Sequence, residues 1–156
     1  MLISTKKFII VFLFLTFTDI ASAELIKANP NLSPVDVLKI QLNSLKINDN
    51  PYPDAGIDQT WELAHPDNKK FTGPLSRFKT MIYSDDYKIL LNHISHEIEI
   101  LLESDSIYVF KVNVKTKDNE IYFYEWQITK VKNEDPLKEC WLTTSVSRPS
   151  LVGEQV

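Results

Sequence analysis

The spacing of apolar residues changes once along this chain, near residue 90, and this change restricts the fold more than any other feature. Before it, Val35, Leu38, Leu42 and Leu45 recur at steps of three and four, which is the period of one helix face. After it, apolar and polar residues alternate, as they do in half-buried strands. Helices followed by a run of strands predict an α+β domain.

Capping and turn residues divide the first part of the chain into three expected helices. Ser33 and Pro34 suit the N-cap and the first position of a helix that ends before the turn-forming cluster at residues 48–54. A second helix is expected from Ile57 to Ala64, where the sequence HPDN at residues 65–68 breaks it. A third is expected to begin at residues 72–74, with Thr72 as its N-cap, and to end at residues 84–86.

The alternating part predicts a curved antiparallel sheet of about four strands. The alternating runs cover residues 97–103, 107–115, 122–129 and 141–146. One face of such a sheet is apolar enough to need cover, and the preceding helices are the available cover. We therefore expect a single α+β domain over residues 24–147, followed by a flexible tail over residues 148–156.

The first 23 residues have the pattern of a signal peptide. Lys6 and Lys7 precede an apolar run, and the sequence ASA at residues 21–23 fits a signal peptidase site. We expect cleavage after Ala23, a periplasmic or secreted protein, and no stable membrane insertion after cleavage. An uncleaved N-terminal anchor is the alternative, although the run is shorter than the roughly 20 apolar residues that a membrane span needs.

The charge and the cysteine content exclude several classes of partner and chemistry. Of 17 basic and 21 acidic residues, loss of Lys6, Lys7 and Asp19 leaves 15 and 20, so the mature chain is acidic and unsuited to nucleic acid. The single cysteine, Cys140, cannot form an internal disulfide, and its apolar neighbours favour a buried thiol over a nucleophile.

Cofactor and metal motifs are missing from the sequence. The three glycines are far apart, which excludes a phosphate-binding loop and a dinucleotide fingerprint. His93 and His96 are three residues apart and could share a metal on a helix, but not on a strand. They match no zinc signature, and we predict neither a metal site nor a cofactor.

Two groups of side chains are candidates for a functional site. His65, Asp67, His93 and Arg77 are titratable groups near predicted helix ends, and catalysis would need two of them to converge on one pocket. Each also has a structural explanation, in turn formation, capping or ion pairing. The aromatic residues Trp61, Tyr124 and Trp126 fall on predicted inward faces, where they would be core residues or the walls of a ligand pocket.

The order of elements and four segments resemble a known type of fold. The segments are IQLNSLKINDNPYPDAGI, TWELAHPDNKKFTGPLSRFKTMI, YKILLNH and CWLTTSV. Together they resemble an uncharacterised family of domains with the nuclear transport factor 2-like cone fold, to which ketosteroid isomerase and SnoaL-type proteins belong. The resemblance implies helices over a curved sheet. It implies no particular reaction, because this fold carries both enzymes and binding proteins.

These features favour an exported binding protein over an enzyme. We expect it to bind a small apolar molecule or a protein partner through its pocket or sheet face. A small isomerase or hydrolase, using a pocket histidine with a carboxylate, is the alternative. A homodimer formed through Leu101 and Trp141 on an outward sheet face is a third hypothesis.

Overall fold

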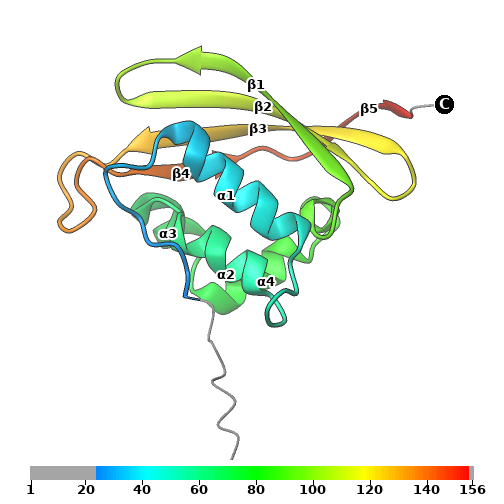
Figure 1. The fold of residues 1–156 in the computed structure, drawn as a ribbon, viewed down its shortest axis with the longest axis horizontal. Helices are drawn as coiled ribbons and strands as arrows, with labels where there is room; N and C mark the ends of the chain where they lie inside the picture. Colours follow the sequence, from blue (N-terminus) through cyan, green and yellow to red (C-terminus); the bar gives the residue numbers. More distant parts are fainter. Residues whose placement is uncertain (1–23, 155–156) are drawn as a thin grey trace, which may run out of the picture.

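The structure is a computed structural model that describes residues 24–154 of the chain. Figure 1 shows the helices first and the strands after them, so the expected α+β class is confirmed. The predicted signal peptide falls on residues 1–23, which lie outside the described residues. The elements are α1 (Pro34–Lys46), α2 (Ala55–Glu62), α3 (Pro66–Thr72), α4 (Leu75–Ile82), the 3-10 turn η1 (Lys88–Leu90), β1 (Ser95–Glu103), β2 (Ile107–Lys115), β3 (Glu120–Lys130), β4 (Trp141–Val146) and β5 (Ser150–Glu154).

Helix α1 begins where the capping residues predict. The Ser33 hydroxyl accepts a hydrogen bond from the Asp36 amide at 3.1 Å, and the Asp36 carboxylate accepts one from the Ser33 amide at 3.0 Å. This reciprocal pair satisfies two of the amide groups that a helix start leaves unpaired. The apolar stripe of Leu38, Leu42 and Leu45 is fully buried against the sheet, which fixes the face that α1 turns inward.

The chain between α2 and α4 differs from the prediction. The segment expected to be a break after His65 is helix α3, with His65 as its N-cap and Pro66 at its first position. Proline suits that position because its fixed φ matches a helix and its missing N–H would be unpaired there anyway. Thr72, expected to cap the next helix, is instead the last residue of α3, and α4 begins at Leu75.

The strands form one antiparallel sheet that does not close into a barrel. Its order is β1-β2-β3-β4, and β5 pairs with β3 on the same side as β4. Strand β4 pairs with the second half of β3, from Trp126 onward, while β5 pairs with the first half, Glu120 to Phe123. Strand β5 differs from the prediction, because the sequence predicts a flexible tail over residues 148–156. The long strand β3 would otherwise leave backbone groups unpaired along that half, and the tail supplies their partners.

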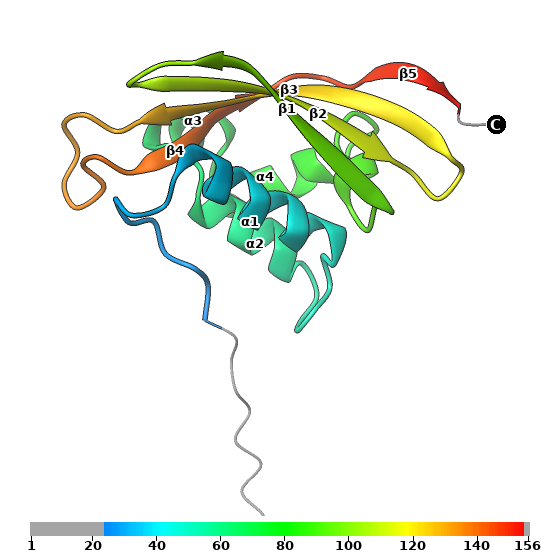
Figure 2. The same ribbon diagram turned by 45° about the horizontal axis from the view of Figure 1, so that its top comes forward.

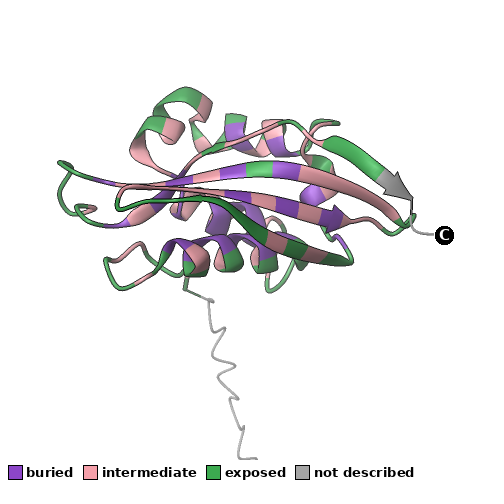
Figure 3. Ribbon diagram, turned by 90° about the horizontal axis from the view of Figure 1, so that it is seen from above, coloured by how far each residue is buried: buried purple, intermediate pink, exposed green. Residues whose placement is uncertain are grey.

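The helices lie together on one face of the sheet, as Figures 1 and 2 show. Alternate residues of β2 and β3 point toward them and are fully buried, including Phe110, Val112, Tyr124 and Ile128. Figure 3 shows this alternation along the two central strands, and it shows that the edge strand β1 is mostly exposed. The core therefore lies between α1, α2 and α4 on one side and the middle of the sheet on the other.

Candidate functional site

A cavity of about 280 Å³ lies between helices α3 and α4 and the end of the sheet formed by β3 and β4. Most of its wall is apolar, and it combines residues that are far apart in the sequence. Its walls are made by Leu45, Thr60, Ala64, Asp67, Asn68, Phe71, Thr72, Phe78, Met81, Ile82, Tyr87, Leu90, Trp126, Thr143, Thr144, Ser145 and Val146.

The polar atoms at the floor of the cavity are bonded to one another. The Trp126 indole N–H donates to the Thr143 hydroxyl at 3.0 Å, and this hydroxyl donates to the Gln41 side-chain oxygen at 2.6 Å. The Gln41 amide then donates to the Thr60 backbone carbonyl at 3.0 Å. All of these groups are buried and bonded to other protein atoms, so the floor offers few polar atoms to a ligand or to water.

The mouth of the cavity is more polar and lies along α3. The Asn68 amide donates to the Thr143 backbone carbonyl at 3.2 Å, and the Thr72 hydroxyl donates to the Asn68 backbone carbonyl at 2.8 Å. Phe71 is 80% exposed beside them, although its ring also lines the cavity. Helix α3 buries none of its residues, so polar bonds hold it over the cavity.

Of the three aromatic residues expected to be core residues or pocket walls, Trp126 lines this cavity. Tyr124 is fully buried in the core, and its hydroxyl donates to the Asp86 backbone carbonyl at 2.9 Å. Burial raises the pKa of this Tyr124 hydroxyl, which keeps it protonated. Trp61 packs against Phe78 with 5.0 Å between ring centroids, on the other side of the cavity wall.

His65 and Asp67 border a second, polar hollow of about 320 Å³, whose wall continues through residues 129–134. The His65 ring nitrogen Nδ1 accepts a hydrogen bond from the Asp67 amide at 3.1 Å. Burial lowers the pKa of His65, although the nearby Asp67 carboxylate opposes this shift. The ring is therefore neutral with its proton on Nε2, and the 3.6 Å approach of Nδ1 to the Asp67 carboxylate is not an ion pair.

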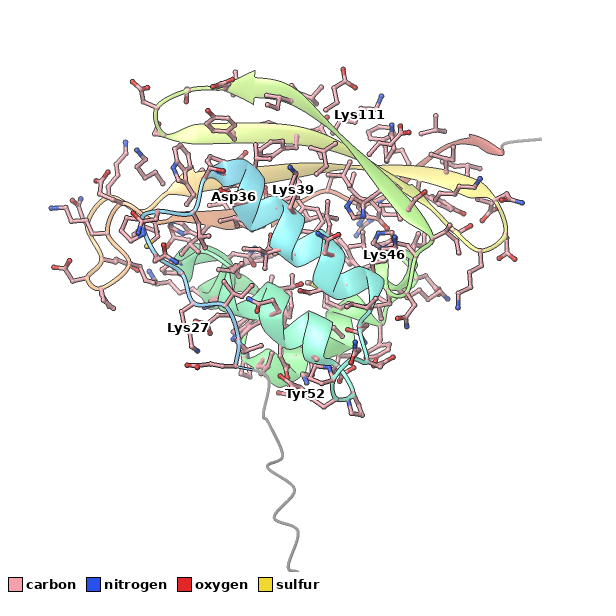
Figure 4. The ribbon with its side chains drawn as sticks, in the orientation of Figure 1. Lys27, Asp36, Lys39, Lys46, Tyr52 and Lys111 are labelled. Atoms are coloured by element: carbon pink, nitrogen blue, oxygen red, sulfur yellow. The ribbon has the colours of Figure 1, made fainter. Side chains whose placement is uncertain are left out.

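The buried His93 and the half-buried His96 form a pair that lines neither hollow. His93 Nδ1 lies 2.7 Å from the Leu90 carbonyl, which can only accept, so His93 donates there. Its Nε2 is 2.8 Å from His96 Nδ1 and must then accept that bond when His93 is neutral. Burial lowers the pKa of His93 to about 4, and Lys46 at the end of α1 adds to this shift (Figure 4). No carboxylate takes part in these bonds.

The remaining candidates lie apart from both hollows. Arg77 is exposed on α4 and lines neither of them. Cys140 is buried, and burial raises the pKa of its thiol, which favours a structural role. Among residues 24–154, no group of three or more His, Cys, Asp or Glu side chains is arranged to hold a metal ion.

Two residues of the cavity wall, Thr143 and Phe71, and the residue behind it, Gln41, were not expected from the sequence. Gln41 interrupts the apolar stripe of α1 and Thr143 lies in the last alternating run, so each is a polar residue at an inward position. Gln41 was therefore a usable signal of a buried hydrogen bond, whereas Thr143 was not, because alternation places it on the face opposite Leu142. Phe71 gave no signal, because the segment around it shows no apolar period.

Comparisons with known protein families, with curated proteins and with solved structures found no match for this chain. Within the described residues, no helix is long and apolar enough to span a membrane. The geometry of the cavity is therefore the observation from which a function can be argued.

Proposed function

We propose that this protein binds a small apolar molecule in the cavity between α3, α4 and β4, without transforming it. The observation that carries this proposal is the floor of the cavity, where the side-chain polar groups of Trp126, Thr143 and Gln41 are already bonded to other protein atoms. Water in such a space would lack the hydrogen bonds that it needs, whereas apolar atoms would not. A dry apolar cavity of ~150 Å³ is enough to bind benzene, and this one is larger.

The arrangement of His65 favours binding over catalysis. A histidine that acts as a general base needs a ring nitrogen with a free lone pair near the substrate. In this protein the Nδ1 lone pair of His65 is occupied by the Asp67 amide, and the proton lies on Nε2. His93 likewise uses both of its ring nitrogens inside the protein. An isomerase or hydrolase would need a rearrangement of one of these histidines.

A protein partner is a second candidate, favoured by the exposed edge strand β1. Ile100, Leu101 and Leu102 are 47%, 48% and 50% exposed, and edge strands commonly accept a strand from another protein. Trp141, expected beside Leu101, packs instead against the core and the Tyr108 ring. If β1 binds a partner, Leu101→Lys should abolish that binding and leave ligand binding in the cavity unchanged.

We also propose that the domain has the nuclear transport factor 2-like cone fold and that the protein is exported. Helices on one face of a twisted, open antiparallel sheet support the nuclear transport factor 2-like cone. The sequence of residues 1–23 supports export to the periplasm or the medium. N-terminal sequencing of the protein from its producing cell should give a chain that begins at Glu24. A chain that begins at Met1 would contradict export by cleavage.

Titration with 1-octanol tests the proposed ligand site. NMR of the isotope-labelled protein should show saturable shifts at the amides of Thr60, Ala64 and Thr143. Ala64→Leu adds three carbons, which fill roughly 90 Å³ of the cavity, and should weaken binding at least ~10-fold. The matched control is Ala28→Leu, because Ala28 is partly buried but does not line the cavity.

A second variant covers the case in which Ala64→Leu does not fold. Met81→Trp fills the cavity from the opposite wall, on the partly exposed helix α4, and should weaken binding in the same way. Equal affinity in the native protein and in a folded cavity-filling variant would refute the proposal. Binding to the native protein that produces shifts only outside the cavity would refute it as well.

A further inference from the structure

The mouth of the cavity, unlike its floor, has side-chain hydrogen-bond donors and acceptors that are available to a ligand. The Asn68 amide nitrogen uses one of its two hydrogens on the Thr143 carbonyl, and the Thr72 hydroxyl uses its single hydrogen within α3. One Asn68 N–H and the lone pairs of the Thr72 hydroxyl therefore remain for a ligand. Ser145, exposed on β4, adds a third neutral polar group at the mouth.

The charge at the mouth is negative. Asp67 is the only charged residue among those that line the cavity in the described part of the chain. Lys70 lies beside it, but its ammonium group is shared between Asp67 at 3.1 Å and Glu134 at 3.4 Å. Two carboxylates thus face one cation, and an anionic group at the mouth would meet repulsion without gaining a free positive partner.

The volume limits the length of the apolar part of the ligand. A methylene group takes up about as much space as one water molecule in the liquid, ~30 Å³, so 280 Å³ accommodates ~9 carbons. The buried residues Leu45 and Leu90 line the cavity together with Trp126, so an alkyl chain or ring would end against them.

From these observations we infer that the ligand is an uncharged amphiphile with an apolar part of about nine carbons or fewer. Its alcohol, carbonyl or amide end lies between Asn68, Thr72 and Ser145, and its apolar part fills the cavity. This inference rests on the proposed function and adds a selection rule to it. A carboxylate of the same chain length is rejected, because it would be partly desolvated beside Asp67.

Three ligands with the same chain test the rule: 1-octanol, octanoate and octylammonium, titrated by NMR at pH 8, where the carboxylate is ionised. Octanol should bind at least ~10-fold more tightly than octanoate, because an unpaired charge is costly to desolvate. Asp67→Asn should reduce the ratio of octanol affinity to octanoate affinity by about threefold. The effect is modest because the Asp67 carboxylate is largely exposed and water screens its charge. The matched control, Glu99→Gln, removes the same charge from the exposed outer edge of the sheet and should leave the ratio unchanged.

The results of these titrations distinguish a failure of the preference for uncharged ligands from a failure of ligand binding in the cavity. If octanoate binds as tightly as octanol, or more tightly, the rule is wrong although the cavity still binds ligands. The same holds if octylammonium binds much more tightly than octanol, since Asp67 would then select a cation. If none of the three binds, the proposed function fails. If Glu99→Gln changes the ratio as much as Asp67→Asn does, net charge rather than the mouth controls selection.

Discussion

At the scale of single residues, Thr143 connects the stability of the protein to the character of its cavity. Its hydroxyl accepts from the Trp126 indole and donates to Gln41, so one small side chain satisfies two larger buried ones. Its backbone carbonyl accepts hydrogen bonds from the His65 amide and the Asn68 side chain. A polar residue that looks ordinary in the sequence therefore joins α1, β3, β4 and α3.

Replacement of Thr143 by valine should destabilise the protein more than its size change suggests. Valine has nearly the same shape, but it leaves the Gln41 oxygen and the Trp126 N–H buried without partners. The free energy of unfolding should fall by about 2–6 kcal/mol, because each unpaired buried group costs about 1–3 kcal/mol. Thr129→Val on the same sheet is the control and should change it by less than about 0.5 kcal/mol. Chemical denaturation measures both, and equal effects would contradict the role given to Thr143.

His93 should make the stability depend on pH between about pH 6.5 and pH 4. Its pKa is lowered to about 4 in the folded protein by burial, while the unfolded chain titrates near 6.5. The unfolded state therefore binds more protons in this range, so the free energy of unfolding falls as the pH falls. The contribution lost between pH 7 and pH 4 is roughly 3 kcal/mol.

The variant His93→Asn isolates this contribution. An asparagine amide can still donate to the Leu90 carbonyl in place of Nδ1, but it does not titrate. Denaturation curves at several pH values should show a shallower fall in stability for the variant than for the native protein. Carboxylates with lowered pKa values, such as Asp54 and Asp85, lose their contribution only below about pH 4. Parallel curves for the two proteins between pH 6.5 and pH 4 would rule out His93 as the cause.

At the scale of elements, the packing of α1 on α2 depends on Gly56. A Cβ atom at this position would lie 2.2 Å from the Ser44 carbonyl oxygen of α1 and 2.9 Å from the Asn48 Cα. The helices are this close because α2 starts against the end of α1, where the Gly56 amide donates to the Asn48 carbonyl at 2.9 Å. Gly56 also accepts a hydrogen bond from the hydroxyl of Thr60, a residue of the cavity wall, at 2.8 Å.

Gly56→Ala should therefore destabilise the protein, although alanine normally favours a helix over glycine by up to about 1 kcal/mol. The clash is with backbone atoms, which cannot rotate away, so the helices must separate. We expect a loss of about 3 kcal/mol in the free energy of unfolding, at the upper end for overpacking. Lys39→Ala, on the exposed face of α1, should be nearly neutral. A thermal melt that shows Gly56→Ala to be as stable as the native protein would contradict this packing.

The elements also show which parts of the fold the sequence specifies locally. Ser33, Pro34 and the Leu38–Leu42–Leu45 stripe predict α1 because capping and period agree, and the alternation in residues 107–129 predicts β2 and β3 in the same way. Helix α3 was not predicted, since it buries no residue and so has no apolar stripe to detect. Strand β5 follows Pro149 and forms because β3 offers unpaired backbone groups, which no local pattern encodes.

At the scale of the whole molecule, the cavity arises where segments distant in the sequence fail to fill the space between them. Asn68 and Thr143 are 75 positions apart, yet their bond defines the mouth. The inward direction of Trp126 follows from strand alternation, and so it could be expected to be core or wall. Whether the space beside it is filled depends on where α3 lies, and that depends on contacts between chain segments.

The central claim is that this space holds the apolar part of an uncharged ligand, and the most direct test is to locate 1-octanol in the bound protein. Isotope-filtered NOE spectra of the labelled protein report which protons lie within about 5 Å of the ligand. The terminal methyl group of octanol should give NOEs to Trp126, Leu45 and Leu90, and the carbon next to its hydroxyl should give them to Asn68 and Thr72. NOEs from octanol to exposed residues such as Leu101 and Leu102, with none to Trp126, would contradict the claim.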